Sequence, residues 1–316
     1  MNSIVLTGAT SMLGVALIKE CIKNQTNVLA IVRRNSINFH RIQDSTYVKI
    51  VECNLDELEN LELPEDNYDV FYHFAWDYTD KKNRDNALYQ NLNIKYTLNA
   101  VELAHKSGCS TFIGAGSQAE YGKVNDIIAP DTPINPDIAY GIAKYAAGRL
   151  SGLLCCDLGI KHIWTRVFSV YGPYDNQETM IMYSIRKLLN HEKPIYTKSE
   201  QLWDYLYCDD AARAFYLVGV KGKDKAVYCI GSGKVQQLSE YIYKIRDSID
   251  ISLPIGIGEK DYSKNQVMYL CADISNLIID TGFQPIYSFD EGIHNSIEWF
   301  KKDNKNILRQ NGGKYE

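Results

Sequence analysis

Three polar residues near the middle of the chain have the types and spacing needed for acid–base chemistry on an alcohol or a carbonyl. Tyr140 and Lys144 stand at positions i and i+4 of "AYGIAKYAAGRL", so on a helix they share one face. A phenol with a pKa near ~10 is a poor acid–base group at neutral pH, but a cation one turn away stabilises the phenolate. Ser117 stands just past an expected strand in "FIGAGSQAEYG", where its hydroxyl can bind a carbonyl oxygen beside Tyr140.

A glycine-rich stretch near the start of the chain, "TGATSMLG" at 7–14, is a candidate phosphate loop. A loop that leaves a first strand and enters a helix places backbone N–H groups and the positive helix end beside a pyrophosphate. Gly8 permits the tight turn, and Gly14 lets the helix pack closely on the strand. Ser11 replaces the usual middle glycine. Serine is a favoured N-cap, so we expect Ser11 at the helix N-terminus, beside a cofactor phosphate.

Two arginines end the second expected strand, "VLAIVRRNS". NAD sites of this kind usually carry an acidic residue there, which accepts from the ribose hydroxyls. Arg33 and Arg34 instead suit a 2′-phosphate, by charge and by bidentate geometry. The alternative interpretation is a solvated basic turn. The sequence therefore favours NADP(H) as cofactor and keeps NAD(H) as the alternative.

The elements that must position these residues alternate between strands and helices. Such alternation predicts an α/β fold with a Rossmann-type, doubly wound parallel sheet. The expected strands are 3–7, 27–32, 47–52, 68–74, 110–115 and 161–168. The expected helices lie near 12–24, 84–107 and 138–158.

A turn-rich break, "YGPYDNQ", follows these elements. We expect a dinucleotide-binding domain at 1–172, carrying the serine, tyrosine and lysine, and a smaller α/β substrate-binding lobe at 173–316. Segments of that lobe could return to the first domain. Within it the pattern indicates short strands at 193–207, a strand at 226–230, and helices at 179–191, 209–219 and 238–247. The lobe is expected to close over the carboxyl edge of the sheet, where ligands of open α/β sheets bind.

Composition excludes several classes of protein. The net charge is −5 and the pI is about 5.8, which argues against a general binder of nucleic acid or of membrane surfaces. No apolar run approaches the ~18 to 20 residues of a membrane helix, and no secretion leader is visible. The eight cysteines include no CxxC pair, so neither a disulfide framework nor a metal site is expected. These features favour a cytoplasmic enzyme.

Taken together, the motifs resemble those of extended short-chain dehydrogenases/reductases of the nucleotide-sugar epimerase, dehydratase and reductase group. The resemblance runs nearly end to end. "TGATSMLG" resembles TGxxGxxG, and "DVFYHFAW" (69–76) resembles DxVxHxAA. "NIKYTLNAVELA" (93–104) resembles an NxxGT helix, with Tyr96 in place of glycine. "RVFSVYGP" (166–173) is similar to RxxNxYGP with Ser169 for asparagine, and "QLWDYLYCDDAARAF" (201–215) is similar to RDFxxVDDxxxA with Trp203 for arginine.

The resemblance implies a nucleotide-sugar substrate, and a homodimer formed through the helices at 84–107 and 138–158. Ser117, Tyr140 and Lys144 fall on the catalytic positions of the family. The expected cofactor-binding residues are Gly8, Thr10, Ser11, Met12, Leu13, Gly14, Arg33, Arg34, Asn54, Leu55, Phe74, Ala75, Trp76, Asn93, Lys144 and Val167. The expected substrate-binding residues are Trp76, Asp77, Ser117, Gln118, Tyr140, Ser169, Tyr171, Gln201, Trp203 and Asp204.

Three activities are compared within this resemblance. Dehydratases carry Thr-Asp-Glu where this chain has Ser117-Gln118-Ala119, which makes a 4,6-dehydratase the least expected enzyme. The segments "GSQAEYG", "HFAW" and "QLWDYLY" look most like the sequences of CDP-abequose synthase and similar 4-ketoreductases. Together with Arg33 and Arg34, this resemblance predicts NADPH-dependent reduction at C4 of a nucleoside-diphosphate 4-keto-6-deoxyhexose. The alternatives are a 4-epimerase that keeps its NAD and, from another class, a non-catalytic sensor of NADP(H).

Overall fold

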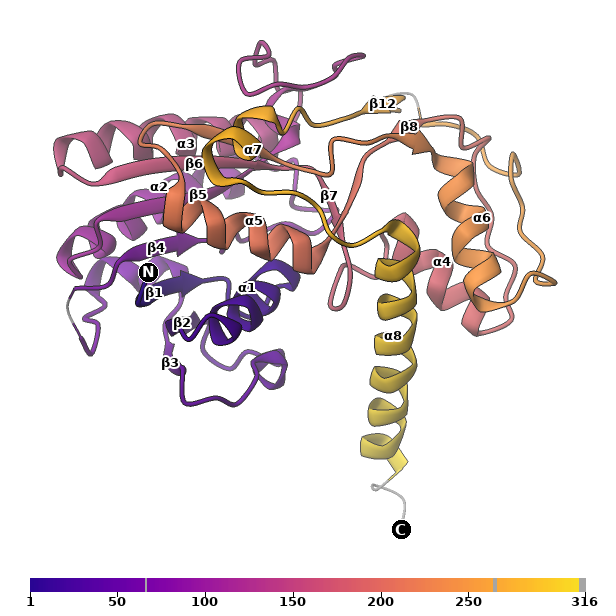
Figure 1. The fold of residues 1–316 in the computed structure, drawn as a ribbon, viewed down its shortest axis with the longest axis horizontal. Helices are drawn as coiled ribbons and strands as arrows, with labels where there is room; N and C mark the ends of the chain where they lie inside the picture. The colour runs from indigo at the N-terminus through magenta and orange to yellow at the C-terminus, as the bar shows by residue number, and fades with distance from the viewer. Residues whose placement is uncertain (66, 264–265, 313–316) are drawn as a thin grey trace.

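A seven-stranded, all-parallel sheet forms the centre of the molecule in the computed structural model, which describes residues 1–65, 67–263 and 266–312 (Figure 1). The strand order is β10-β6-β5-β4-β1-β2-β3. Adjacent strands pair in parallel throughout, as expected for a doubly wound sheet. The strands are β1 Ser3–Thr7, β2 Asn27–Val32, β3 Val48–Glu52, β4 Val70–His73, β5 Thr111–Ser117, β6 Lys161–Val167 and β10 Val227–Ile230.

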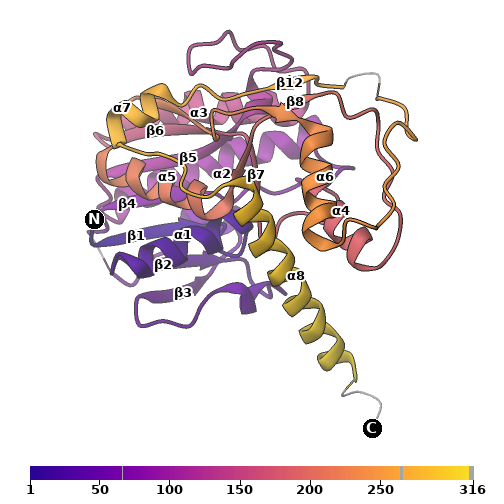
Figure 2. The same ribbon diagram turned by 45° about the vertical axis from the view of Figure 1, so that its right-hand side comes forward.

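Helices cover both faces of this sheet (Figures 1 and 2). One face carries α1 Met12–Lys23, α5 Cys208–Lys221 and α7 Ser275–Thr281, and the other carries α2 Ala87–Lys106 and α3 Ala139–Asp157. Alternate residues of β1 enter different cores: Ile4 and Leu6 pack in the cluster that includes Phe215, whereas Val5 packs in the one that includes Val101. This period of two follows from the strand pleat. The inner strands β4 and β5 are buried at every position, because both faces of the sheet are covered, whereas the edge strand β3 exposes Lys49 and Glu52.

The expected elements are present, and two boundaries that bear on the site differ. The α2 helix begins at Ala87 rather than at 84, because the Asn86 side chain accepts N–H groups of Leu88 at 3.1 Å and Tyr89 at 3.2 Å and caps the helix there. The β5 strand continues through Ser117 instead of ending at 115. Ser117 is therefore the last residue of a strand, which fixes its backbone more firmly than a loop would.

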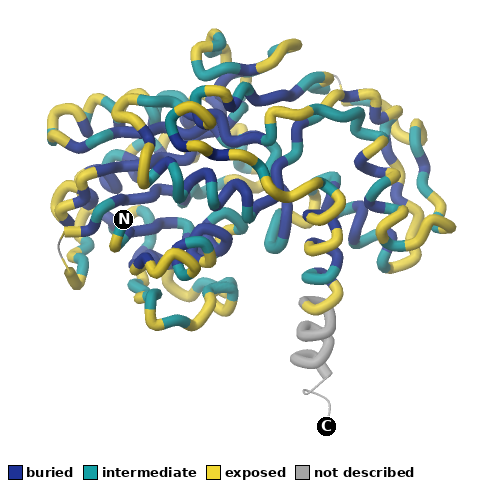
Figure 3. Tube along the Cα trace, in the orientation of Figure 1, coloured by how far each residue is buried: buried dark blue, intermediate teal, exposed yellow. Residues whose placement is uncertain are grey.

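The smaller lobe contains α4 Met180–Leu189, α6 Leu238–Ile249 and α8 Phe289–Gly312, and each has buried positions (Figure 3). Their apolar cluster also includes Ala16 of α1 and Ala212 of α5. Its strands are short: β7 Ser169–Tyr171 pairs with β9 Tyr205–Tyr207, and β8 Leu202–Trp203 lies between β11 Gln236–Gln237 and β12 Tyr269–Leu270. Three short 3₁₀ helices complete the described elements, η1 Phe39–Arg41, η2 Leu55–Asn60 and η3 Gln118–Glu120.

The chain passes between the two regions more than once. After β9 it returns to the large sheet as α5 and β10, and after β12 it returns as α7, before α8 packs on α6. The 173–316 segment thus contributes one strand of the seven-stranded sheet. Within the described residues, no helix has both the length and the apolar character needed to cross a membrane.

Candidate active site

The glycine loop has the geometry of a phosphate cradle. Gly8 has φ +73°, and a Cβ there would meet the backbone nitrogen of Ala75 at 2.7 Å. A Cβ on Gly14 would meet the carbonyl oxygen of Gly8 at 2.3 Å. Glycine at both positions is therefore required by the close approach of backbones. The loop ends at the N-terminus of α1, where unpaired N–H groups and the helix dipole favour an anion.

Ser11 caps this helix, as predicted. Its backbone is extended, its hydroxyl accepts the N–H of Gly14 at 3.1 Å, and the same hydroxyl donates to the carbonyl of Gly8 at 2.7 Å. The serine thus closes the loop on itself in the position where the related motifs carry glycine. The residues present fit the pyrophosphate of a dinucleotide.

A cavity of about 1110 Å³ runs from this loop along the carboxyl edge of the sheet into the smaller lobe. Most of the residues predicted to bind cofactor or substrate line it. They are Gly8, Thr10, Ser11, Leu13, Arg33, Asn54, Leu55, Phe74, Ala75, Trp76, Asp77, Ser117, Gln118, Tyr140, Lys144, Val167, Ser169, Tyr171, Gln201 and Trp203. The sequence motifs, far apart along the chain, therefore share one cavity.

Two predicted residues, Arg34 and Asn93, have their side chains engaged away from this cavity. Arg34 donates to the Glu57 carboxylate at 2.6 Å, so of the two predicted arginines only Arg33 lines the cavity. Asn93 is buried, accepting the N–H of Asp77 at 2.8 Å and donating to its carbonyl at 3.1 Å. It supports a cavity wall rather than forming one.

Asp204 is the clearest correction to the expected substrate contacts. Its side chain is fully buried, and its carboxylate accepts backbone N–H groups of Ser232 at 2.8 Å, Gly233 at 3.0 Å and Ala272 at 3.1 Å. These contacts join three segments of the chain, which indicates a structural role. Met12 lies on a neighbouring cavity of about 510 Å³, which also includes Arg41 and Tyr174. Gly14 lies beneath the loop.

Ser117, Tyr140 and Lys144 come together at the carboxyl end of β5. Ser117 ends that strand, Tyr140 and Lys144 project from the first turns of α3, and all three residues line the same cavity. The Lys144 ammonium donates to the carbonyl of Ala115 at 2.6 Å. Two hydroxyls and one ammonium therefore meet at the wall of the cavity, as the spacing predicts.

The cation nearer to the Tyr140 ring is Arg84, whereas the spacing in the sequence predicts Lys144. The Lys144 nitrogen lies 5.8 Å from the centroid of the Tyr140 ring, whereas the Arg84 guanidinium carbon lies 3.9 Å from it. Burial raises the pKa of Tyr140, which the charge of Arg84 and the hydrogen bond from Ser117 partly oppose. Burial lowers the pKa of Lys144 to about 7, against the influence of the Glu120 carboxylate.

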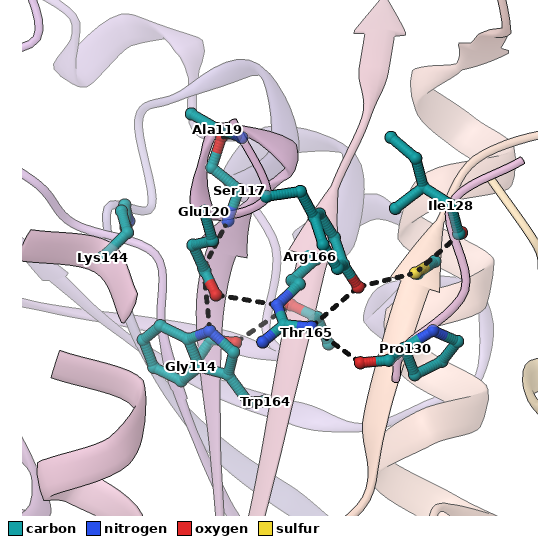
Figure 4. Close-up of polar contacts among 12 residues, drawn as sticks. Gly114, Ser117, Ala119, Glu120, Ile128, Pro130, Lys144, Trp164, Thr165 and Arg166 are labelled. Atoms are coloured by element: carbon teal, nitrogen blue, oxygen red, sulfur yellow. Dashed lines mark hydrogen bonds and ion pairs between the residues drawn. The ribbon is translucent and has the colours of Figure 1, made fainter. Parts of the chain in front are cut away.

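Glu120 organises the strand end that carries Ser117 (Figure 4). The fully buried carboxylate accepts the backbone N–H of Ser117 at 2.9 Å, the indole N–H of Trp164 at 3.0 Å and the Arg166 Nε–H at 2.7 Å. Arg166 in turn donates to the Tyr121 hydroxyl at 2.7 Å. The carboxylate is therefore paired and hydrogen-bonded, as a buried charge must be.

Two departures from the related motifs, Ser169 and Trp203, contact each other at the wall of the cavity. The indole N–H of Trp203 donates to the hydroxyl of Ser169 at 2.7 Å. Trp203 stands where the related motif has arginine, and Ser169 where it has asparagine. Where the related motifs carry arginine and asparagine, this chain therefore has an indole and a hydroxyl that bond to each other.

Four charged residues of the cavity were not predicted from the sequence: Arg41, Asp56, Arg84 and Asp175. Arg84 lies in the segment "TDKKNRDN", whose composition is that of an ordinary polar loop, so no local signal identifies it. Glu120 was visible beside Ser117 in the sequence, but its partners come from β6. Among the residues that the structure describes, no group of three or more His, Cys, Asp or Glu side chains could hold a metal ion.

Comparison with known proteins is consistent with this geometry. A Methanocaldococcus jannaschii protein provisionally named UDP-glucose 4-epimerase is 26% identical over 96% of this chain and 99% of its own length. The structure of a UDP-N-acetylglucosamine 4-epimerase from Methanobrevibacter ruminantium, in complex with UDP-N-acetylmuramic acid, has a TM-score of 0.86 at 21% identity and covers 96% of this chain and 99% of that one. A dTDP-glucose 4,6-dehydratase from Streptomyces venezuelae, with NAD bound, has a TM-score of 0.83 at 18% identity, over 96% and 98%.

These relatives are epimerases and a dehydratase, and none of the three is a 4-ketoreductase. The two solved structures share the Rossmann-like sheet and the smaller carboxyl-terminal region. The profile of one family matches residues 4–231, which is most of the chain. The chain belongs to the NAD dependent epimerase/dehydratase family.

Proposed function

We propose that the chain transfers hydride at C4 of a nucleoside-diphosphate sugar and acts as a 4-epimerase. The observation that carries this proposal is that Ser117, Tyr140 and Lys144 line the same cavity as the Gly8 loop. A nicotinamide cofactor held by that loop would supply the redox chemistry by taking hydride and returning it. Epimerisation then requires the 4-keto sugar to present its other face within the cavity.

The residues of the chain perform the proton chemistry. Tyr140 takes the proton of the C4 hydroxyl during oxidation and gives it back during reduction. Ser117 donates a hydrogen bond to the sugar oxygen, where charge develops. Lys144 would hold a ribose hydroxyl of the bound cofactor through its ammonium, which donates to the carbonyl of Ala115 in this structure.

Two observations support epimerisation over dehydration. Two of the three relatives above carry the name of a 4-epimerase acting on a UDP sugar. Elimination of water needs an acid and a base beside the serine, where this chain has Gln118 and Ala119. Glu120 cannot replace them, because its carboxylate is buried and paired with Arg166.

A second candidate is NADPH-dependent reduction of a nucleoside-diphosphate 4-keto-6-deoxyhexose. The specific observation that favours it is Arg33, which follows β2 and lines the cavity where NAD enzymes carry an acid. A 2′-phosphate would pair with this guanidinium. The Asp77 carboxylate lies 4.0 Å from the same guanidinium.

The test starts with the full chain as purified. It is denatured to identify any retained cofactor, and then assayed with UDP-glucose, UDP-galactose and UDP-N-acetylglucosamine, and separately with dTDP-4-keto-6-deoxyglucose plus NADPH. Interconversion of a UDP sugar and its C4 epimer supports the epimerase. NADPH oxidation that depends on the keto sugar supports the reductase.

Tyr140→Phe provides the control for both reactions. It should abolish turnover and leave cofactor binding intact, because the phenol oxygen is needed only for proton transfer. If no nucleotide sugar is converted, and if the cellular role of the chain survives Tyr140→Phe, the protein senses NADP(H) without catalysis and both enzyme proposals are wrong.

A further inference from the structure

In the loop between β4 and α2, the guanidinium of Arg84 lies against the ring of Tyr140, the proposed acid–base residue. The Arg84 guanidinium carbon lies 3.9 Å from the centroid of the Tyr140 ring, within the range of a cation–π contact. The next residue, Asp85, accepts the backbone N–H of Ala139 at 2.8 Å, immediately before Tyr140. Two consecutive loop residues therefore hold the first turn of α3, one through its backbone and one through the ring of Tyr140.

This loop is anchored by a buried side chain. Gln90, of which only 1% is exposed, donates to the carbonyls of Tyr78 at 2.9 Å and Asn83 at 3.3 Å. Its side-chain oxygen accepts the indole N–H of Trp76 at 2.9 Å. The backbone before Arg84 is thus held by Gln90, and the residue after it by the contact of Asp85 with Ala139. This reduces the entropy lost when the guanidinium rests on the ring.

The groups around Tyr140 come from its own helix, from the end of β5 with the turn after it, from β6, and from the segment after β4. Its own helix contributes Lys144, whose ammonium is directed to a carbonyl and lies 5.8 Å from the ring centroid. The β5 end and the turn after it contribute the Ser117 hydroxyl and the Glu120 carboxylate, the latter paired with Arg166 of β6. The segment after β4 contributes the Trp76 edge and Arg84. Arg84 is therefore the nearer of the two cations to the phenol ring.

We propose that Arg84 is a positioning residue of the active site, which holds the Tyr140 ring and stabilises its phenolate by charge. The proposal rests on the proposed function in one respect, that Tyr140 is the acid–base residue. It assigns the support of the phenolate to a loop residue outside the Tyr-x-x-x-Lys motif. Lys144 is then free to engage the cofactor without removing the cation on which the phenolate depends.

The balance of charges agrees with this role. Burial raises the pKa of Tyr140, and of the groups that oppose burial Arg84 has the largest influence, ahead of the Ser117 hydrogen bond. The Glu120 carboxylate acts in the opposite direction. Removal of Arg84 should therefore leave a phenol that is harder to ionise.

The direct test is carbon NMR of the full chain labelled at the tyrosine Cζ, which reports ionisation of each phenol without any substrate. Tyr140→Phe identifies the resonance of Tyr140. In Arg84→Gln and in Arg84→Met, which keeps an apolar contact with the ring, the pKa of Tyr140 should rise by about one unit. Arg84→Lys should give an intermediate value. Lys82→Gln, an exposed residue of the same loop, should leave the titration unchanged.

The kinetic test uses whichever nucleotide sugar the wild type converts. In the oxidation direction kcat/KM should rise with pH as Tyr140 ionises. In Arg84→Gln the apparent pKa of this rise should be higher than in the wild type, by the same shift that the NMR titration gives. A Tyr140 resonance that titrates identically in the wild type and in both charge-removing variants overturns this proposal and leaves the proposed function standing. Absence of turnover in the wild type contradicts the proposed function, and the NMR titration still decides the role of Arg84.

Discussion

The Lys144 ammonium lies against the face of the Trp76 indole, 3.6 Å from the ring centroid. The indole is fixed in turn by its hydrogen bond to Gln90. Cation–π contact of this kind offsets part of the cost of removing an ammonium from water, but only part, because burial still lowers the pKa of Lys144 to about 7. The cofactor-free protein therefore holds a lysine that is readily neutralised.

This lysine should make stability depend on pH. Its pKa is about 7 in the folded protein and about 10.5 in the unfolded chain, so between these values the unfolded chain binds more protons. The free energy of unfolding should rise as pH rises through this window. Urea midpoints of the cofactor-free wild type should show the rise, and those of Lys144→Met should show less of it. A rise of equal size in Lys144→Met would contradict the assignment, and Lys82→Met, at an exposed site, is the control.

Ser11 should matter for stability more than for cofactor binding. Ser11→Ala removes the N-cap of α1 and should lower the free energy of unfolding by about 1 kcal/mol, whereas Ser11→Gly should cost only a few tenths. Ser11→Gly also restores the usual glycine of the loop, so its affinity for NAD(P) should equal or exceed that of the wild type. Denaturation and cofactor titration measure the two effects. Equal stability of the alanine variant and the wild type would show that the cap is dispensable.

Arg33 and Arg34 should differ in their influence on cofactor choice. Arg33→Asp places an acid at the cavity wall and should shift the NADPH-to-NADH affinity ratio by about tenfold or more toward NADH, since a charge-assisted hydrogen bond is lost. Arg34→Asp breaks only the pair with Glu57 and is the matched control. Fluorescence titration with both cofactors provides the measurement. A larger change in Arg34→Asp than in Arg33→Asp would reverse the assignment.

The outer faces of α2 and α3 should form a homodimer. They expose Leu88, Ile142 and Leu153, to 80%, 53% and 64%, and an apolar face of this kind commonly marks an interface. Leu153→Glu should shift the chain from dimer to monomer in analytical ultracentrifugation. Ile279→Glu on α7, where the residue is 78% exposed, should leave the mass unchanged. A monomeric wild type would rule out this assembly.

The elements of the large sheet were predictable because most of its strands are buried on both faces and its helices keep the helical spacing of apolar residues. Ser117, Tyr140 and Lys144 were predictable for a related reason, since spacing along a single helix or strand end fixes their direction. Arg34 and Asp204 were not: whether an arginine lines a cavity or pairs with Glu57, and whether an aspartate meets ligand or three backbone N–H groups, depends on segments distant in sequence. The role of Arg84 was not predictable for the same reason, because only the folded loop brings it to Tyr140.

The return of the chain to the large sheet sets a limit on folding during synthesis. The β6 strand, next to the strand that ends at Ser117, acquires its outer neighbour only when β10 at Val227–Ile230 pairs with it. Until that part of the chain has left the ribosome, β6 remains an unpaired edge, open to pairing with other chains. The nascent protein therefore completes its seven-stranded sheet only after much of its smaller lobe has emerged.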